Sequence, residues 1–265
     1  MKKSMSICFA FLLLFGYVNS AHAISNHPIH WGFKKGSNGQ QADAGQEYET
    51  LLKKYGGFYK GNAKDKILYL TFDNGYENGY TERILDVLKK EKVPATFFVT
   101  GHYLRSAPEI TKRMVNEGHI VGNHSWSHPD LTKMSVPKIK DELNKVQKET
   151  ERITGQKTMQ YLRPPRGILS ERTLKVAQEA GYTHVLWSLA YKDWEVDHQK
   201  GWKYAYDHIL AQVHPGAVLL LHTVSKDNAE ALEKVIQDLK KQGYTFKSLD
   251  DFVMKEQIKN PALTM

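Results

Sequence analysis

The chain has 265 residues, a formal net charge of +8 at pH 7 and 41% hydrophobic residues. This length and apolar content suffice for one large α/β domain or two small ones, and they exclude a generally disordered chain. The single cysteine, Cys8, lies in the N-terminal segment interpreted below as a removable signal, which excludes a disulfide, a thiol nucleophile and a cysteine-ligated zinc from the mature chain.

Residues 1–23 have the pattern of a secretory signal peptide. Lys2 and Lys3 precede an apolar stretch from Ile7 to Val18, and Ala21-His22-Ala23 supplies an A-x-A cleavage site. The alternative, a membrane anchor, is disfavoured because the apolar run is shorter than the ~20 residues of a membrane span. We therefore expect cleavage before Ile24 and a secreted protein on the cell-wall side of the membrane, without a stable membrane span.

Export and net charge together bear on the partners of the chain. Export argues against nucleic acid as a partner. A basic exported protein suits a polyanionic surface such as a bacterial wall, although the charge is equally compatible with simple solubility. We expect the chain to act as a monomer.

The rest of the chain divides into three parts. Residues 24–65 are rich in Gly, Asn, Gln and Lys and are interpreted as an irregular segment packed on the main domain. Residues 66–255 form the main domain, in which short β-rich runs alternate with amphipathic stretches, and residues 256–265 form a tail. The runs are Ile67–Phe72, Thr96–Thr100, Ile120–Gly122, Tyr161–Arg163, His184–Leu189, Val218–His222 and Tyr244–Phe246.

Helix start and stop signals stand between these runs. Ser106 and Glu109 have the spacing of a capping box for a helix that ends at Gly118. Three further helices are expected: one from Ser135 to Gly155, one from Ser170 to Gly181, and a last one that carries Leu232, Val235, Ile236 and Leu239 and ends at Gly243. Alternating strands and helices predict a parallel α/β fold with about seven strands, either a (β/α) barrel or an open sheet.

Reactive side chains recur at or just after the ends of the expected strands. Asp73, His124 and Asp193 follow three of them, and Arg163 and His222 close two others. In a parallel barrel these C-terminal ends converge on one mouth, where active sites are built. We therefore expect these five residues to meet.

The segment His124-Ser125-Trp126-Ser127-His128 is the candidate metal site. Two imidazoles four residues apart can face one ion if the backbone makes a helical turn, and the alternative is two loop histidines with structural hydrogen bonds. Ser125 stands where the zinc-protease motif H-E-x-x-H has Glu, so a peptidase is disfavoured.

Thr71-Phe72-Asp73-Asn74-Gly75 leads from a strand into a tight turn. Asp73 can accept a proton from water, and the amide oxygen of Asn74 can ligate a metal more weakly than a carboxylate does. The alternative interpretation is an Asp-Asn-Gly turn selected only for its backbone geometry.

Two further segments complete the candidate site. Arg163-Pro164-Pro165-Arg166-Gly167 is a stiff loop that can hold a guanidinium against a carboxylate and present a backbone N–H to an oxyanion, unless it is only a rigid connector. Asp193 can raise the pKa of His222 and fix its tautomer, which suits His222 to protonate a leaving amine. Trp194, Tyr191 and Trp126 are candidates for stacking on sugar rings, although aromatic residues are more often buried in the core.

Taken in order, these motifs resemble those of the polysaccharide deacetylases, the family-four carbohydrate esterases with the NodB homology domain. The shared motifs are T-F-D-[D/N]-G at Thr71–Gly75, H-[S/T]-x-x-H at His124–His128, R-P-P-x-G at Arg163–Gly167, D-W at Asp193–Trp194 and L-x-H at Leu220–His222. The resemblance spans roughly residues 66–250. It implies a distorted (β/α) barrel of seven strands and the hydrolysis of N-acetyl groups on an amino sugar.

The resemblance also implies residue roles. Asp73 is the general base, His222 the general acid, Arg163 orients Asp73, and Asp193 tunes His222. His124 and His128 bind a divalent metal, with zinc or cobalt expected. Most family members have Asp where this chain has Asn74, so we expect Asn74 to be a weak ligand and the ion to be loosely held.

The run from Thr71 to Tyr80 and Arg166 resemble the subgroup that deacetylates N-acetylmuramic acid in peptidoglycan. That subgroup acts in making muramic δ-lactam in the spore cortex, which implies glycan strands as partner and the spore envelope as a location. Arg166 is expected to favour an acidic glycan.

Three alternatives stay open at this point. The first is deacetylation of another wall amino sugar such as N-acetylglucosamine. The second is a catalytically impaired glycan-binding protein, because Asn74 weakens the metal site. A barrel glycosidase that uses Asp73 and Glu77 as its carboxylate pair is the third reading.

Overall fold

The computed structural model describes residues 24–36 and 38–259. The expected signal peptide at residues 1–23 and the last six residues of the expected tail therefore lie outside the described residues. No helix in the described part of the chain has both the length and the hydrophobicity needed to cross a membrane.

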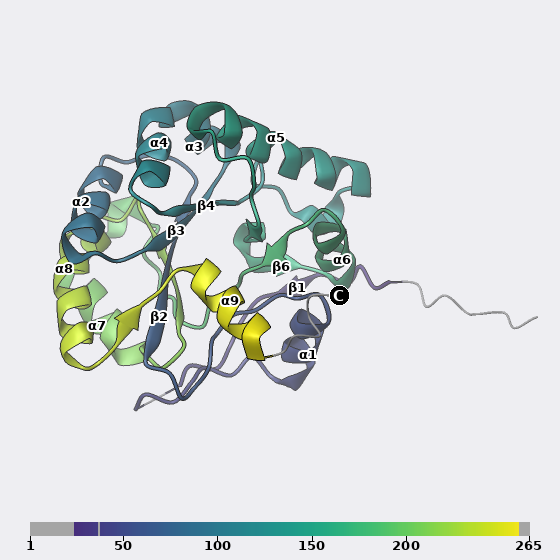
Figure 1. Ribbon diagram of the computed structural model, residues 1–265. Coiled ribbons are helices and arrows are strands. Elements are labelled where there is room, and N and C mark those ends of the chain that lie inside the picture. The colour runs from purple at the N-terminus through teal and green to yellow at the C-terminus, as the bar shows by residue number, and fades with distance from the viewer. Residues whose placement is uncertain (1–23, 37, 260–265) are drawn as a thin grey trace, which may run out of the picture.

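One parallel sheet of seven strands organises the fold. Its order is β7-β5-β4-β3-β2-β8, and β9 pairs with the first two residues of β2 (Figure 1). Each strand begins and ends within two residues of the bounds of an expected run, except that β7 ends at His184, well before Leu189. The strands are β2 (Ile67–Asn74), β3 (Ala95–Val99), β4 (Ile120–Asn123), β5 (Tyr161–Leu162), β7 (Thr183–His184), β8 (Val218–His222) and β9 (Thr245–Phe246).

The segment after β7 closes this sheet into a distorted barrel. The expected strand His184–Leu189 is wrong in its length. Pairing with β5 ends at His184, and the residues that follow pair with other parts of the chain. Val185 bridges to Phe58, and Leu189 bridges in parallel to Leu219 of β8 at the far edge of the sheet. This bridge connects the segment after β7 to β8 at the opposite edge of the sheet, so the barrel is the correct alternative and the open sheet is not.

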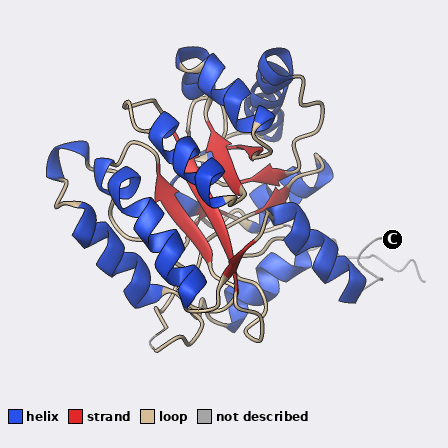
Figure 2. Ribbon diagram, turned by 60° about the vertical axis from the view of Figure 1, so that its left-hand side comes forward, coloured by secondary structure: helices blue, strands red, loops and turns tan. Residues whose placement is uncertain are grey.

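Helices surround the sheet in an order that follows the strands (Figure 2). Each helix contacts the next one in the order α7, α8, α2, α4, α5 and α6. The short α3 contacts α4 and α5. The main hydrophobic core lies between these helices and the sheet. The helices are α2 (Thr81–Glu91), α3 (Gly101–Ser106), α4 (Pro108–Asn116), α5 (Val136–Thr154), α6 (Glu171–Glu179), α7 (Trp202–Gln212), α8 (Lys226–Lys241) and α9 (Leu249–Lys259).

The expected helix signals are right in three cases and wrong in one. Ser135 and Ser170 occupy N-cap positions, Ser170 within a reciprocal capping box with Thr173, and the last long helix ends just before Gly243. The capping box at Ser106 does not form. Ser106 ends α3 and bonds back to the carbonyl of His102, and α4 begins at Pro108, whose fixed φ suits a first helical position.

The segment of residues 24–65 contains regular structure that its weak periodicity did not reveal. It includes α1 (Gln46–Lys54) and β1 (Ile29–His30), which pairs antiparallel with β6 (Ile168–Leu169). A separate hydrophobic cluster joins this segment to the chain after Arg163. Its buried members are Leu52, Tyr55, Tyr59, Leu169, Leu174 and Leu186. This cluster fixes the segment directly behind the Arg163–Gly167 loop.

Candidate functional site

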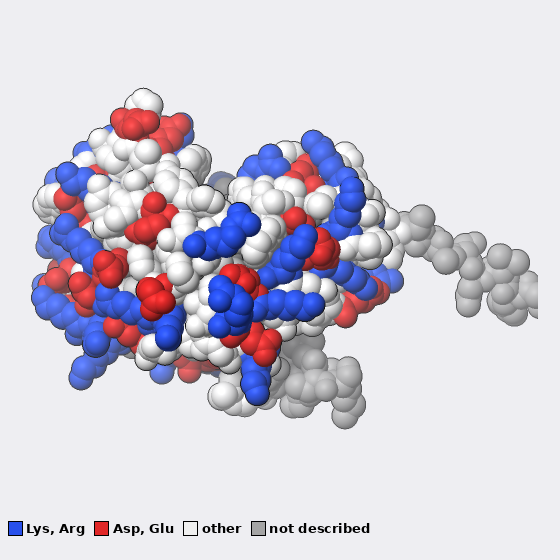
Figure 3. Space-filling view, turned by 90° about the horizontal axis from the view of Figure 1, so that it is seen from above, with Lys and Arg blue, Asp and Glu red and all other residues white. Residues whose placement is uncertain are grey.

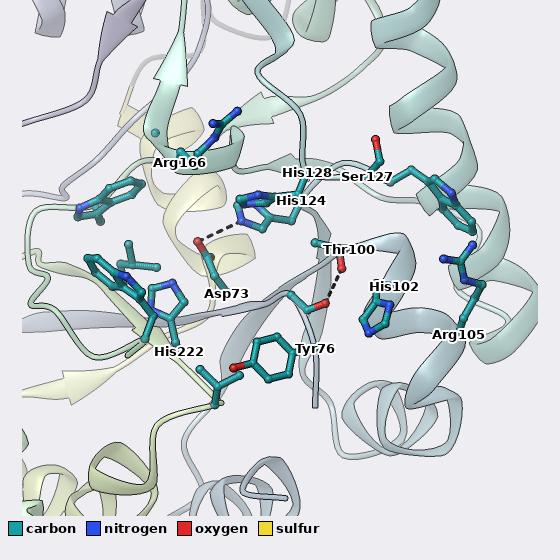
Figure 4. A pocket seen from close by; sticks show the side chains of 17 residues that line it. Asp73, Tyr76, Thr100, His102, Arg105, His124, Ser127, His128, Arg166 and His222 are labelled. Carbon is teal, nitrogen blue, oxygen red and sulfur yellow. Dashed lines mark hydrogen bonds and ion pairs between the residues drawn. The ribbon is translucent and has the colours of Figure 1, made fainter. Parts of the chain in front are cut away.

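The register of β2 against β8 brings two of the expected site residues together. Asp73 is the Cα partner of His222 on the neighbouring strand. Both lie at the C-terminal ends of parallel strands, where neighbouring strands present side chains to one mouth. Both line a cavity of about 800 Å³, together with His124 and His128 (Figure 4).

Asp73 is held by a buried guanidinium. Arg163 Nη1 donates to Asp73 Oδ1 over 2.9 Å and to Thr71 Oγ1 over 2.8 Å, and Arg163 Nε donates to the Val185 carbonyl over 3.1 Å. The Arg163 side chain is fully buried. Burial alone would raise the pKa of Asp73, but the Arg163 guanidinium above all, with the His222 imidazole, holds it below its usual value. Asp73 is therefore ionised and fixed in direction, as a general base requires.

His222 is paired with the carboxylate of Asp193. Its Nδ1 lies 2.7 Å from Asp193 Oδ1, and its backbone N–H donates to Asp193 Oδ2 over 2.8 Å. Asn228 also donates to Asp193 Oδ2, over 2.6 Å. Burial lowers the pKa of His222, yet the Asp193 carboxylate outweighs it and raises the pKa above its usual value. The arrangement leaves Nε2 as the proton donor toward the cavity.

The two histidines of the candidate metal site meet, but not through a helical turn. Ser125 and His128 have left-handed backbones, with φ of 63° and 56°, so the segment is an irregular loop. Their ring centroids nevertheless lie 4.8 Å apart. Asn123 and Glu142 hold the loop, because Asn123 Oδ1 accepts from Ser125 N and the Glu142 carboxylate accepts from both Ser127 N and Ser127 Oγ.

The tautomer of His124 follows from its neighbour. His124 Nδ1 lies 2.8 Å from the Arg163 carbonyl oxygen, which can only accept, so Nδ1 carries the hydrogen and Nε2 keeps its lone pair. That Nε2 lies 3.5 Å from Asp73 Oδ2. Burial lowers the pKa of His124, and burial with the neighbouring His124 lowers that of His128 to about 4. Both imidazoles are neutral at pH 7, which suits them as metal ligands.

Asn74 keeps a buried amide oxygen without a hydrogen-bond partner among the described residues. Its side chain is fully buried, its Nδ2 donates to Thr223 Oγ1 over 2.8 Å, and it does not line the cavity. No group of three or more His, Cys, Asp or Glu side chains within residues 24–36 and 38–259 is arranged to hold a metal ion. The two imidazoles fit a divalent cation. The amide oxygen of Asn74 accepts no hydrogen bond from the described part of the chain, so Asn74 as a third, weaker ligand stays a prediction.

The four expected substrate-contacting residues differ in their positions. Arg166 and Trp194 line the cavity, and the Trp194 ring meets that of His222 edge-on at 5.5 Å. Tyr191 is buried away from the cavity and donates its hydroxyl to Asn228 Oδ1, so it supports the Asp193 network and cannot stack on a sugar. Trp126 lines the cavity, but Arg105 lies over its ring at 5.1 Å.

The carboxylate pair of a glycosidase is absent. Glu77 does not line the cavity. Its carboxylate accepts from Gly79 N over 2.6 Å and from the hydroxyl of Tyr103 over 3.0 Å, so it stabilises the turn before α2. The cavity also contains residues that sequence reasoning missed, among them Tyr76, His102, Arg105 and Trp187. His102, Arg105 and Trp187 lie outside every motif named above, and Tyr76 lies in the run from Thr71 to Tyr80 but was not expected to line the site.

The Arg166–Gly167 turn is held from outside the main domain. Both residues have left-handed backbones, with φ of 57° and 65°, a conformation that costs about 1–2 kcal/mol for a residue other than glycine. Trp31 secures the turn, because its backbone N–H donates to the Gly167 carbonyl over 2.8 Å and its Nε1 donates to the Trp187 carbonyl over 3.0 Å. Trp31 thus connects two walls of the cavity.

Comparison with known proteins agrees with this geometry. The model of the polysaccharide deacetylase family matches residues 60–185. The peptidoglycan-N-acetylmuramic acid deacetylase PdaA of Bacillus subtilis is 56% identical over 99% of this chain and 100% of that protein. An uncharacterised 30.6 kDa protein of Geobacillus stearothermophilus is 61% identical over 95% of this chain and 96% of that protein. The solved structure of Bacillus subtilis PdaA, a family 4 carbohydrate esterase, superimposes with a TM-score of 0.87 at 57% identity and covers 88% of this chain and 100% of that one.

Replacing Asp193 with Asn tests the pairing with His222. Loss of the carboxylate charge removes the group that raises the pKa of His222, so protonated His222 is lost at lower pH. We expect the alkaline limb of the pH–rate profile to move to lower pH while the acid limb stays in place. Asp197→Asn, which removes an exposed carboxylate nearby, serves as the control. An unmoved alkaline limb in the Asp193 variant contradicts the assignment.

Trp31→Phe tests whether Trp31 positions the turn. The variant keeps an aromatic ring and the backbone bond to Gly167 but loses the donor to the Trp187 carbonyl. We expect kcat/KM to fall about tenfold, because small displacements of positioning groups are costly in catalysis. Thermal unfolding and kinetics are measured together, with exposed Trp202→Phe as control. A lower unfolding temperature with unchanged kcat/KM in the folded enzyme makes the role purely structural.

Proposed function

The chain belongs to the polysaccharide deacetylase family, a family of hydrolases, and on that premise we propose that it removes the N-acetyl group from N-acetylmuramic acid in peptidoglycan. The observation that carries the proposal is the placement of Asp73, fixed by Arg163, beside His222, fixed by Asp193, on adjacent strands of one cavity. A base and an acid held on two sides of one space suit amide hydrolysis. Identity to PdaA along almost the whole chain supports muramic acid as the sugar.

The chemistry divides between the two paired groups. Asp73 accepts a proton from the attacking water, and its direction is set by Arg163. The tetrahedral intermediate that forms carries an oxyanion, and the Arg166–Gly167 turn lies on the cavity wall where a backbone N–H can stabilise it. His222 donates a proton to the sugar nitrogen, and the bond between this nitrogen and the acetyl carbon breaks. Acetate is released, and the free amine stays on the sugar.

The family is in general metal-dependent. In this chain His124 and His128 would hold a divalent cation, zinc or cobalt, with the remaining positions open to water and substrate. When bound, the cation supplies Lewis-acid polarisation of the acetyl carbonyl. Because Asn74 offers a neutral amide oxygen where most family members have a carboxylate, the ion is expected to be loosely held.

The proposed location follows from the substrate. Peptidoglycan lies on the outer side of the cell membrane, so the chain acts at the cell wall, with the spore envelope as the specific site and muramic δ-lactam formation as the purpose. The signal peptide expected at residues 1–23 supports export. We propose that the chain acts as a monomer on glycan strands.

Asp73→Asn tests the assignment of the base. The variant keeps the size of the side chain but cannot accept the proton, so we expect acetate release to fall by about 100-fold or more. Mass spectrometry of peptidoglycan fragments after incubation identifies the sugar that lost acetyl, with Asp73→Asn as the matched inactive control and circular dichroism as the check on folding. Activity equal to wild type removes Asp73 from the mechanism. Acetyl loss from glucosamine instead of muramic acid overturns the substrate, and no acetyl loss with retained glycan binding favours the impaired binding protein.

Chelation tests the metal. We expect dialysis against a chelator to abolish acetate release and added zinc or cobalt to restore it, because the family's carbonyl activation depends on the ion. His128→Ala should require a higher metal concentration for the same activity. Full activity after exhaustive chelation, with no gain on metal addition, argues against a catalytic cation in this chain.

A further inference from the structure

The cavity is cationic beyond its reacting groups. Among the residues that line it, Asp73 is the one carboxylate, and Arg163 already neutralises it. Arg105 and Arg166 also line the cavity, and Figure 4 shows them on different sides of the Asp73–His124 pair. On the face shown in Figure 3, basic and acidic side chains are interspersed. The cavity therefore offers two separate cations to a substrate, and the mechanism uses neither as acid or base.

The fold builds the position of Arg105 in several steps. Thr100, at the end of β3, caps α3 by accepting from Tyr103 N over 3.2 Å, and its hydroxyl donates to the Gly75 carbonyl over 2.9 Å. This cap aims α3 along the rim of the cavity. His102 and Arg105 lie three residues apart on α3, on one face of the helix, and both line the cavity.

Trp126 forms a platform for Arg105. The Gly101 backbone N–H donates to the Trp126 carbonyl over 3.0 Å, and a Cβ on Gly101 would come within 2.2 Å of the indole ring. The indole is thus pressed against the start of α3, and the Arg105 guanidinium lies 5.1 Å from the centroid of a Trp126 ring. Cation–π stacking restricts the guanidinium while its N–H groups remain able to donate.

The described residues provide no acidic partner for Arg105. Within residues 24–36 and 38–259, no carboxylate lies within ion-pair distance of it, and Glu149, whose pKa it helps to lower, is paired with Arg152 at 2.7 Å. A guanidinium that is stacked, oriented along a cavity and without an ion pair suits an anion from the substrate, and a carboxylate matches its fork geometry.

We propose that Arg105, on its Trp126 platform, forms a subsite for a carboxylate carried by the glycan beyond the sugar that is deacetylated. This inference rests on the proposed function, because it requires a peptidoglycan strand in the cavity. Such a strand offers carboxylates of two origins: the lactyl group of a neighbouring muramic acid and a stem peptide attached to it. Arg105 touches no reacting atom, so it contributes to substrate binding and leaves the chemical step unchanged.

The test compares the full chain with Arg105→Gln and Arg105→Lys on three substrates. These are glycan strands with free lactyl carboxylates, the same strands after conversion of the carboxylates to amides, and strands that keep their stem peptides. We expect Arg105→Gln to raise KM about five- to tenfold on a carboxylated strand with kcat unchanged, as loss of one charge-assisted contact predicts. Arg105→Lys should recover part of the loss, and the amidated strands should not distinguish the variants.

Arg83→Gln is the matched control, because Arg83 is exposed on α2 and does not line the cavity. An effect of Arg105→Gln on stripped strands assigns the subsite to the lactyl carboxylate, and an effect only on strands with stems assigns it to the peptide. Equal KM values for wild type and Arg105→Gln on both carboxylated strands overturn the subsite, and so does an equal rise in KM for Arg83→Gln or on amidated strands. Failure of the wild type to release acetate from any strand refutes the proposed function instead.

Discussion

The buried ion pair between Arg163 and Asp73 is the interaction on which the rest of the site depends. A guanidinium without any exposed surface is tolerated only when its donors are satisfied, because an uncompensated buried charge costs about 3–5 kcal/mol. Arg163 meets this condition with Asp73, Thr71 and the Val185 carbonyl, and its planar group lies 4.3 Å from the centroid of the Phe98 ring. The partners come from three strands or strand ends, so the pair forms only when the barrel has closed. The geometry of the catalytic site therefore forms together with the closed barrel.

Two carboxylates in this site have opposite tasks because their surroundings differ. Asp73 has a permanent cation as its partner, which keeps it ionised and available to accept a proton. Asp193 has His222 as its partner, and it stabilises the protonated imidazole. The assignment of base and acid therefore depends on which cation each carboxylate faces, Arg163 for Asp73 and His222 for Asp193.

Much of this arrangement could be predicted from the sequence because buried parallel strands have continuous apolar runs, and reactive residues at their ends are conspicuous. Asp73, His124, Arg163 and His222 were found in this way. The failures have a common physical origin in side-chain direction, which depends on tertiary packing. Tyr191 stands two residues before Asp193 but turns away into a buried hydrogen bond with Asn228. Arg105 could not be identified as a site residue from the sequence. An exposed arginine on a short helix does not stand out until the structure shows that the helix borders the cavity.

The contact between Trp31 and the Arg166–Gly167 turn has a consequence for how such an enzyme diverges. The family model begins at residue 60, yet the cluster that supports the turn is built partly from residues before that point. Mutations in this outlying stretch can shift the cavity wall by small steps while every signature motif stays intact. Selection can therefore adjust substrate preference through a region that carries none of the reacting groups, and two chains with identical motifs need not share the same kinetics.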